Sequence, residues 1–184
     1  MDIESSLARE IVSFWRDAGE AKWFVRSDAF DGEFSARFER AHFAAARCEL
    51  EHWFESAEGA LALLILLDQF PRNAFRGSAH AYATDSLARH YAARAIANGL
   101  DVEIDVALRA FCYMPFEHSE DAADQDRAVA LFDALGDAKY IHYARLHRDV
   151  IRRFGRFPHR NRELGRQSTP EEQAWLDAGG GFGG

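Results

Sequence analysis

Apolar residues recur along most of this chain with the three-to-four-residue spacing of an α-helix. Phe30, Phe34 and Phe38 show the pattern most simply, and residues 61–67 are apolar on every side, as expected of a helix at the centre of a protein. No segment alternates between apolar and polar residues for long enough to indicate a β-strand. The pattern therefore predicts an all-α protein.

Capping and stop signals divide this pattern into about eight helices. Pro71 is expected to end the central helix, and Pro115 to stop or kink the helix that runs from about Asp105. Glycines that favour a left-handed conformation are expected to close three other helices, at Gly99, Gly136 and Gly155. Residues with capping side chains are expected at the helix starts: Ser27 or Asp28, Ser56, Thr84, Ser119, Asp137 and Thr169.

These helices are predicted to form one domain over residues 1–178, followed by a flexible Gly-rich tail at 179–184. Short turns between the helices favour stacked antiparallel pairs. The expected helix starts are too unevenly spaced for the fixed period of about 34 residues that tetratricopeptide repeats show. We therefore predict an irregular, tetratricopeptide-like layer of antiparallel helices.

The charge balance and the apolar segments exclude two classes of partner. The 184 residues carry 30 acidic side chains against 22 of Lys and Arg, a net charge of −8, whereas a general nucleic-acid-binding protein needs a basic face. The longest apolar run, residues 60–67, is far shorter than the roughly 20 residues that cross a bilayer. We expect neither nucleic acid nor a membrane as a partner.

The N-terminus and the cysteines indicate the compartment. Asp2 and Glu4 lie where a secretory signal would be basic and then apolar. Cys48 and Cys112 show no metal-binding or redox spacing and lie in apolar helical stretches, so both are expected to be buried free thiols in a reducing compartment. The predicted localisation is cytoplasmic.

The unusual polar residues gather in residues 68–73, 115–121 and 155–161, which we call the first, second and third polar segments. Each follows an apolar helical stretch and contains one proline. Polar groups at the ends of core helices are costly to bury unless they find partners. The three polar segments are therefore expected to meet at one place in the fold.

In the first polar segment, Asp68 lies at the carboxyl end of the central helix, where the helix dipole disfavours a negative charge. Arg72 follows four residues later and could neutralise it, unless Pro71 breaks that geometry. A structural ion pair that ties the helix to its turn is the favoured interpretation.

In the second polar segment, Glu117 and His118 place a carboxylate beside an imidazole, the minimum equipment for general acid–base chemistry near neutral pH. His118 with Glu117 or Asp121 is also a partial set of cation ligands, but no metal site is expected because no His-x-x-x-His pair supports it. An acid-rich, capped helix start explains much of the same pattern. No cofactor is expected, because the chain shows no phosphate loop and no dinucleotide fingerprint.

In the third polar segment, Arg156, His159 and Arg160 crowd onto one short loop. Several donors on such a loop suit a carboxylate or phosphate ligand, and they suit acidic side chains of the protein equally well. Residues 101–126 hold eight acids and residues 145–166 hold eight arginines. Pairing between these two stretches is favoured over an anion site.

The polar segments with their flanks, residues 67–73, 114–121 and 153–161, resemble those of a mostly bacterial family known as domain of unknown function 924. The aromatic pairs at 14–15 and 23–24 match this family too, so the resemblance covers nearly the whole chain. It implies an all-α fold similar to tetratricopeptide-like superhelices. No activity, cofactor or catalytic residue is established for the family, so none is transferred to this chain.

Three functions remain open at this point. The favoured one is binding of a small anionic molecule or a peptide end in a polar groove that the three polar segments form. The others are a hydrolase or lyase in which Glu117 and His118 transfer protons, and a structural adaptor that binds a partner helix. The pattern does not predict the oligomeric state. The candidate ligand-binding residues are Asp68, Arg72, Asn73, Glu117, His118, Arg156, His159 and Arg160.

Overall fold

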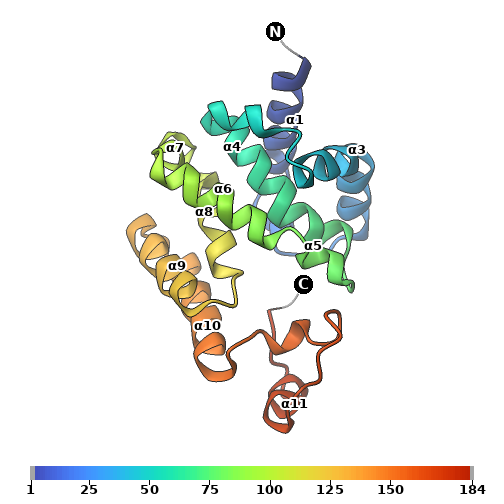
Figure 1. Ribbon diagram of the computed structural model, residues 1–184, viewed down its shortest axis with the longest axis vertical. Coiled ribbons are helices and arrows are strands. Elements are labelled where there is room, and N and C mark those ends of the chain that lie inside the picture. The colour runs from blue at the N-terminus through green and yellow to red at the C-terminus, as the bar shows by residue number, and fades with distance from the viewer. Residues whose placement is uncertain (1–2, 183–184) are drawn as a thin grey trace.

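Helices dominate the described part of the chain, which confirms the all-α prediction. The computed structural model describes residues 3–182, with side chains from Ser6 onward, and contains no strand in that range (Figure 1). The helices of eight or more residues in that range match the predicted number, about eight: α1 (Ile3–Ala18), α3 (Asp28–Ala46), α4 (Ala57–Leu64), α6 (Asp85–Ala97), α8 (Val106–Glu117), α9 (Ala122–Leu135), α10 (Ala138–Phe154) and α11 (Pro170–Asp177). The shorter elements are α2 (Glu20–Trp23), α5 (Phe70–Ala74), α7 (Leu100–Glu103), the 3-10 turns η1 (Glu51–Glu55), η3 (Ala79–Tyr82) and η4 (Pro158–Arg160), and the π-helix η2 (Ile65–Gln69).

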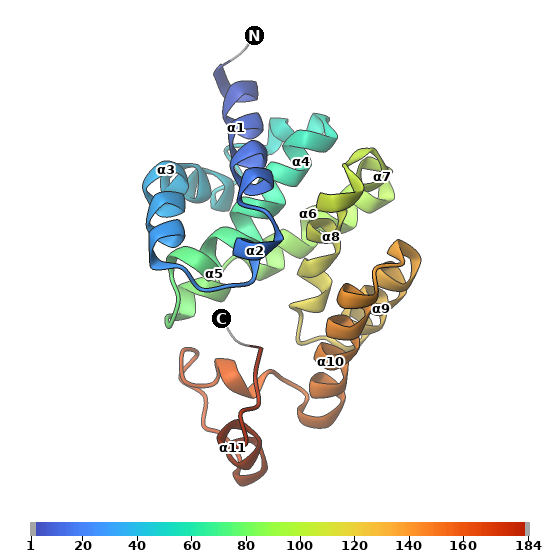
Figure 2. The same cartoon turned by 180° about the vertical axis from the view of Figure 1, so that it is seen from behind.

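The helices pack around α4 as one all-α domain. α4 contacts α1 and α6, α6 packs against α8, α8 against α9, and α9 against α10. Figures 1 and 2 show α1, α3 and α4 toward one end of the molecule and α11 at the other. In both views the segment that follows α10 returns beneath α5, which brings the third polar segment to the first.

The core is one large apolar cluster rich in aromatic rings. Trp15, Phe34, Phe38 and Phe70 are fully buried, and so is nearly all of the surface of residues 60–67, as predicted for a central helix. A smaller cluster lies at the C-terminal end of the molecule and consists of Val150, Ile151 and Phe157, with Phe154, Trp175 and Phe182 packed against it.

Several helix ends follow the predicted local signals. The Ser27 hydroxyl accepts the N–H of Phe30 at 3.3 Å, and the Thr169 side chain forms a capping box with Glu172. Gly99, Gly136 and Gly155 follow the ends of α6, α9 and α10 with φ values of +71°, +81° and +70°, which residues with a side chain rarely adopt.

Pro71 does not end the central helix, so this prediction is wrong. A proline lacks the N–H that would donate to the carbonyl four residues earlier, here that of Leu67. The chain widens into the π-helix η2 and continues as α5, with Pro71 in the first turn of α5. The Thr84 hydroxyl donates to the Leu67 carbonyl instead, at 2.6 Å. Thr84 precedes α6 as predicted, but its side chain makes no capping bond.

The second polar segment also differs from its predicted helix boundaries. Pro115 lies inside α8, which continues to Glu117 before it ends. The next helix, α9, is capped by Asp121, whose carboxylate accepts two backbone N–H groups, and not by Ser119. The Ser119 hydroxyl donates to Asp124 at 2.7 Å. Glu117 is therefore held in the rigid last turn of a core helix.

The cysteines are both free, but only Cys112 is buried, so the prediction is wrong for Cys48, which is exposed. Cys48 follows α3 with φ +59°, a conformation that turns the chain out of the helix. None of the helices in the described part of the chain combines the length and apolarity that a bilayer crossing requires.

The predicted tail lies partly inside the described range. Residues 179–182 are described, and 183–184 lie outside it. The Phe182 ring stacks on His147, with ring centroids 3.5 Å apart. The domain boundary at 178 and the flexibility of the tail stay predictions.

Candidate functional site

The first and second polar segments meet at Asp68, which is 1% exposed. Its Oδ1 accepts a hydrogen bond from Nδ1 of His118 at 2.8 Å and lies 3.2 Å from Nη1 of Arg72, while Gln69 donates to its other oxygen. Burial alone would raise the pKa of Asp68, but the charge of Arg72 and the hydrogen bonds from His118 and Gln69 lower it to about 2. Asp68 is therefore a carboxylate at neutral pH.

The first and third polar segments meet at Asp85, in the first turn of α6. Arg72 donates to both Asp85 oxygens, at 2.8 and 3.0 Å, and Nη1 of Arg160 lies 3.3 Å from Asp85 Oδ2. Two guanidinium groups thus share this one carboxylate. Asp68 lies on the other side of Arg72 and pairs with it, as predicted for this i,i+4 pair. Two carboxylates thus balance the two guanidinium groups.

Arg160 is a buried cation with incomplete hydrogen bonding. Its side chain is 7% exposed and lies between the rings of Tyr82 and Phe157, with its guanidinium carbon 4.6 and 4.5 Å from the ring centroids. Its Nε has no hydrogen-bond partner in the described part of the chain. Burial, together with the positive charge of Arg72, lowers the pKa of Arg160 to about 10. The protein therefore stabilises this positive charge less well than water does.

Glu117 and His118 do not pair with each other, although they are adjacent in the sequence. Oε1 of Glu117 lies 2.9 Å from Nδ1 of His147, whereas the partner of His118 is Asp68. The predicted acid–base pair is thus replaced by two carboxylate–imidazole pairs, whose imidazole centroids lie 6.2 Å apart. Burial and the charge of Arg72 lower the pKa of His118, so its imidazole is neutral at pH 7.

The third polar segment is divided between two surroundings. Arg156 donates to both oxygens of Glu172 in α11, at 2.6 and 2.8 Å, and lies away from Asp68 and Asp85. His159 remains near Arg160, and burial together with the charge of Arg160 lowers the pKa of His159 to about 3. Its Nδ1 has no hydrogen-bond partner among the described residues.

The acidic and the arginine-rich stretches pair in part, as the favoured interpretation predicted. Arg152 donates to Asp126 at 2.8 Å, and Arg166 donates to both oxygens of Glu120, at 2.7 and 2.9 Å. Glu120 also accepts the backbone N–H of Phe157 at 2.7 Å. The bonds of Glu120 anchor the loop that carries the third polar segment to the turn between α8 and α9, where the second polar segment ends.

A cavity of about 720 Å³ opens where the three polar segments meet. Arg26, Arg76 and Lys139 add three cations to its wall, and Trp23, Phe24, Tyr82, Tyr140 and Tyr143 add aromatic rings. Asp68 lies behind the wall, and Arg156 is outside the cavity. Six of the eight candidate residues line the cavity: Arg72, Asn73, Glu117, His118, His159 and Arg160.

The position of Asn73 is fixed by hydrogen bonds to its neighbours. Its amide nitrogen donates to the carbonyl of Gln69 at 2.8 Å, and its oxygen accepts from Nη2 of Arg76 at 2.9 Å. Arg76 also donates through Nε to Asp31 at 2.9 Å. Asn73 therefore orients Arg76 toward the cavity wall.

Sequence reasoning missed two residues that organise this site. Asp85 follows a capping position, where acids are common, and its partner Arg160 lies 75 residues away. His147 is one of several basic residues along α10, and its spacing carried no signal. Within the described residues, no group of three or more His, Cys, Asp and Glu side chains is placed to hold a metal ion.

Comparisons with known proteins agree with the resemblance of the polar segments. A family model described as "Bacterial protein of unknown function (DUF924)" matches residues 11–180. The solved structure of a protein of unknown function, ATU0120 from Agrobacterium tumefaciens, is 55% identical to this chain, covers 95% of this chain and 98% of its own, and superposes with a TM-score of 0.92. No curated protein matches. By its sequence and its fold, the chain belongs to the DUF924 family of bacterial proteins of unknown function.

Proposed function

We propose that the cavity binds a small organic anion through Arg160 and Arg72. The observation that carries this proposal is the state of Arg160, whose buried side chain shares Asp85 with Arg72 and leaves its Nε without a partner in the described chain. A ligand carboxylate or phosphate oxygen would accept the remaining N–H groups of Arg160.

The placement of the charges supports the same proposal. The cations Arg26, Arg72, Arg76, Lys139 and Arg160 line the cavity, whereas Asp68 and Asp85, which hold two of them, lie behind its wall. Glu117 and Glu163 are the acids among the described lining residues. The surface that a ligand meets is therefore more positive than the protein as a whole. A volume of about 720 Å³ is in the range of small-molecule sites.

Arg160→Met tests the proposal. Asp85 keeps its two bonds to Arg72, and the unbranched methionine stays between Tyr82 and Phe157, so the melting temperature is expected to be unchanged or higher. Added phosphate, sulfate or acetate, at constant ionic strength set with chloride, is expected to raise the melting temperature of the parent protein and not that of Arg160→Met.

Arg145→Met is the matched control, because Arg145 is 54% exposed in its pair with Asp133 and lies outside the cavity. This variant should keep the response to anions. Equal stabilisation of all three proteins, or of none, would contradict binding at Arg160. Unfolding of Arg160→Met would show that Arg160 is a structural tie, and His159→Gln then gives the second test of the anion response.

Proton transfer by His118 is a second candidate, favoured by the hydrogen bond to Asp68. This bond holds Nδ1 as the donor and leaves the Nε2 lone pair of a neutral imidazole in a residue that lines the cavity. Hydrolysis of an activated ester such as p-nitrophenyl acetate should then fall about 100-fold in His118→Gln. An equal rate in parent and variant would remove this hydrolase or lyase function.

The adaptor function remains the third alternative, although nothing in the described chain identifies a partner helix. The tetratricopeptide-like arrangement that it requires and the cytoplasmic localisation also stay predictions. The adaptor gains support if neither anions nor ester substrates distinguish the variants above from the parent protein.

A further inference from the structure

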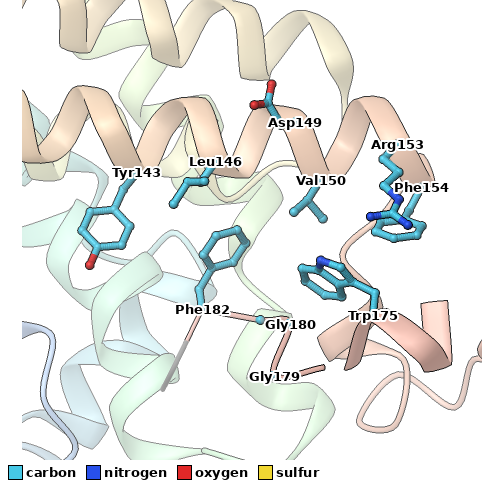
Figure 3. A pocket seen from close by; sticks show the side chains of 11 residues that line it. Tyr143, Leu146, Asp149, Val150, Arg153, Phe154, Trp175, Gly179, Gly180 and Phe182 are labelled. Carbon is cyan, nitrogen blue, oxygen red and sulfur yellow. The ribbon is translucent and has the colours of Figure 1, made fainter. Parts of the chain in front are cut away.

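A second, apolar cavity of about 490 Å³ lies beside the anion cavity, between α10 and the C-terminal segment (Figure 3). Leu146 and Val150 point from α10 toward the rings of Phe182 and Trp175, while Asp149 points away from them (Figure 3). Leu146 is 39% exposed although it is a large apolar residue. We call this second cavity the groove.

The groove is elongated along the helix. On α10 its apolar and aromatic lining residues are Tyr143, Leu146, Val150 and Phe154, which follow one another at intervals of three or four residues and so form one stripe. Asp149 and Arg153 of α10 also line it. From Tyr143 to Phe154 this stripe is about 16 Å long at 1.5 Å per residue. Such a shape suits an extended chain better than a flat ring.

The groove and the anion cavity are neighbours that share part of their walls. Tyr143 and residues 179–182 line both of them. At Gly180, a Cβ atom would lie 2.3 Å from the Trp175 indole, so only glycine lets the backbone pass this close to the groove. Because residues 179–181 are glycines, only a thin stretch of backbone separates the two cavities there.

We infer that the ligand is a carboxylic acid with an unbranched alkyl chain, whose carboxylate binds at Arg160 and Arg72 and whose chain lies in the groove. This inference rests on the proposed function and adds the chemical class of the ligand. A cationic cavity beside an apolar groove matches a molecule with one charged end, and the stripe on α10 gives the chain about 16 Å of contact. A large exposed apolar side chain such as Leu146 is then covered when the ligand binds.

A chain-length series tests the inference. Acetate, hexanoate, octanoate and decanoate carry the same charge, so a gain in affinity along the series measures the contact of the chain alone. Burial of a methylene group gives up to about fourfold in affinity. We expect the dissociation constant, measured by calorimetry below the aggregation concentration of each acid, to fall roughly two- to fourfold per added methylene, and we expect decanol to bind much more weakly than decanoate.

Leu146→Asp should lose this dependence on chain length, because it places a negative charge in the groove. Val102→Asp is the matched control, since Val102 is also an exposed apolar residue, at 64%, and lies far from either lining. This control should keep the full dependence. If light scattering shows a dimer that Leu146→Asp dissociates, the groove belongs to a second copy of the chain and the inference is wrong.

The outcomes separate the two proposals. If acetate and decanoate bind with equal affinity, the groove does not hold the chain, while anion binding stands. If no acid of any length binds, the proposed function fails together with the inference. If decanol binds as tightly as decanoate, the groove is apolar but unconnected to Arg160, and the ligand class is overturned.

Discussion

Replacing Asp68 with alanine is expected to lower the free energy of unfolding by about 3–5 kcal/mol. Asp68 is 1% exposed and bonds to His118 and Gln69, while its Oδ1 lies 3.2 Å from Arg72. Its removal leaves the partly buried guanidinium of Arg72 with less negative charge than it needs and breaks the hydrogen bond that fixes His118. Denaturant unfolding of parent and variant under identical conditions measures this difference.

Asp133→Ala is the matched control for this change. Asp133 also pairs with an arginine, Arg145, but the two side chains are 44% and 54% exposed. A pair in water contributes about 0–1 kcal/mol, so this variant should unfold almost like the parent. Equal stability of Asp68→Ala and Asp133→Ala would show that the carboxylate of Asp68 is solvated and that the network does not support the fold.

The contribution of Asp68 also depends on pH, with a defined sign. Its pKa in the folded protein is about 2, below the ordinary value, so folding favours the charged form. The stabilisation is therefore complete above about pH 4 and is lost as the pH falls toward 2. The stability of the parent should decrease more steeply over this range than that of Asp68→Ala.

The sequence predicted the fold well where local interactions decide it. The spacing of Phe30, Phe34 and Phe38 and the left-handed glycines depend only on residues within a few positions, and these predictions are confirmed. Pro71 was predicted wrongly because its effect depends on a distant residue. The hydroxyl of Thr84 satisfies the carbonyl that Pro71 leaves without a donor, and nothing near Pro71 in the sequence indicates it.

The candidate site shows the same division between local and distant interactions. The cost of burying polar groups correctly predicted that the three polar segments meet, and six of the eight candidate residues line one cavity. The choice of partners could not be predicted. Glu117 pairs with His147 across two helices, and Arg156 pairs with Glu172, which the capping box at Thr169 places beside it.

Asp85 is the residue on which the predicted anion site and the stability of the fold depend together. Its carboxylate accepts hydrogen bonds from both Nη atoms of Arg72 and contacts Arg160, and its side chain is 11% exposed. It thus already occupies one of the positions at which the two guanidinium groups can bind an anion. If the cavity binds carboxylates, a free carboxylate should be able to take the place of this side chain.

Asp85→Ala is therefore expected to lower the free energy of unfolding by about 3–5 kcal/mol, because both Arg72 and Arg160 lose their shared partner. Added acetate should restore part of this loss, since the shorter side chain leaves room for a carboxylate between the two guanidinium groups, and binding to the folded state stabilises it by mass action. Asp85→Asn removes the same charge but keeps the space filled, so acetate should restore much less of its stability. Melting temperatures over an acetate series at constant ionic strength distinguish the two variants. If acetate stabilises Asp85→Ala, Asp85→Asn and the parent equally, its effect is that of a bulk salt, and the two arginines do not form an anion site.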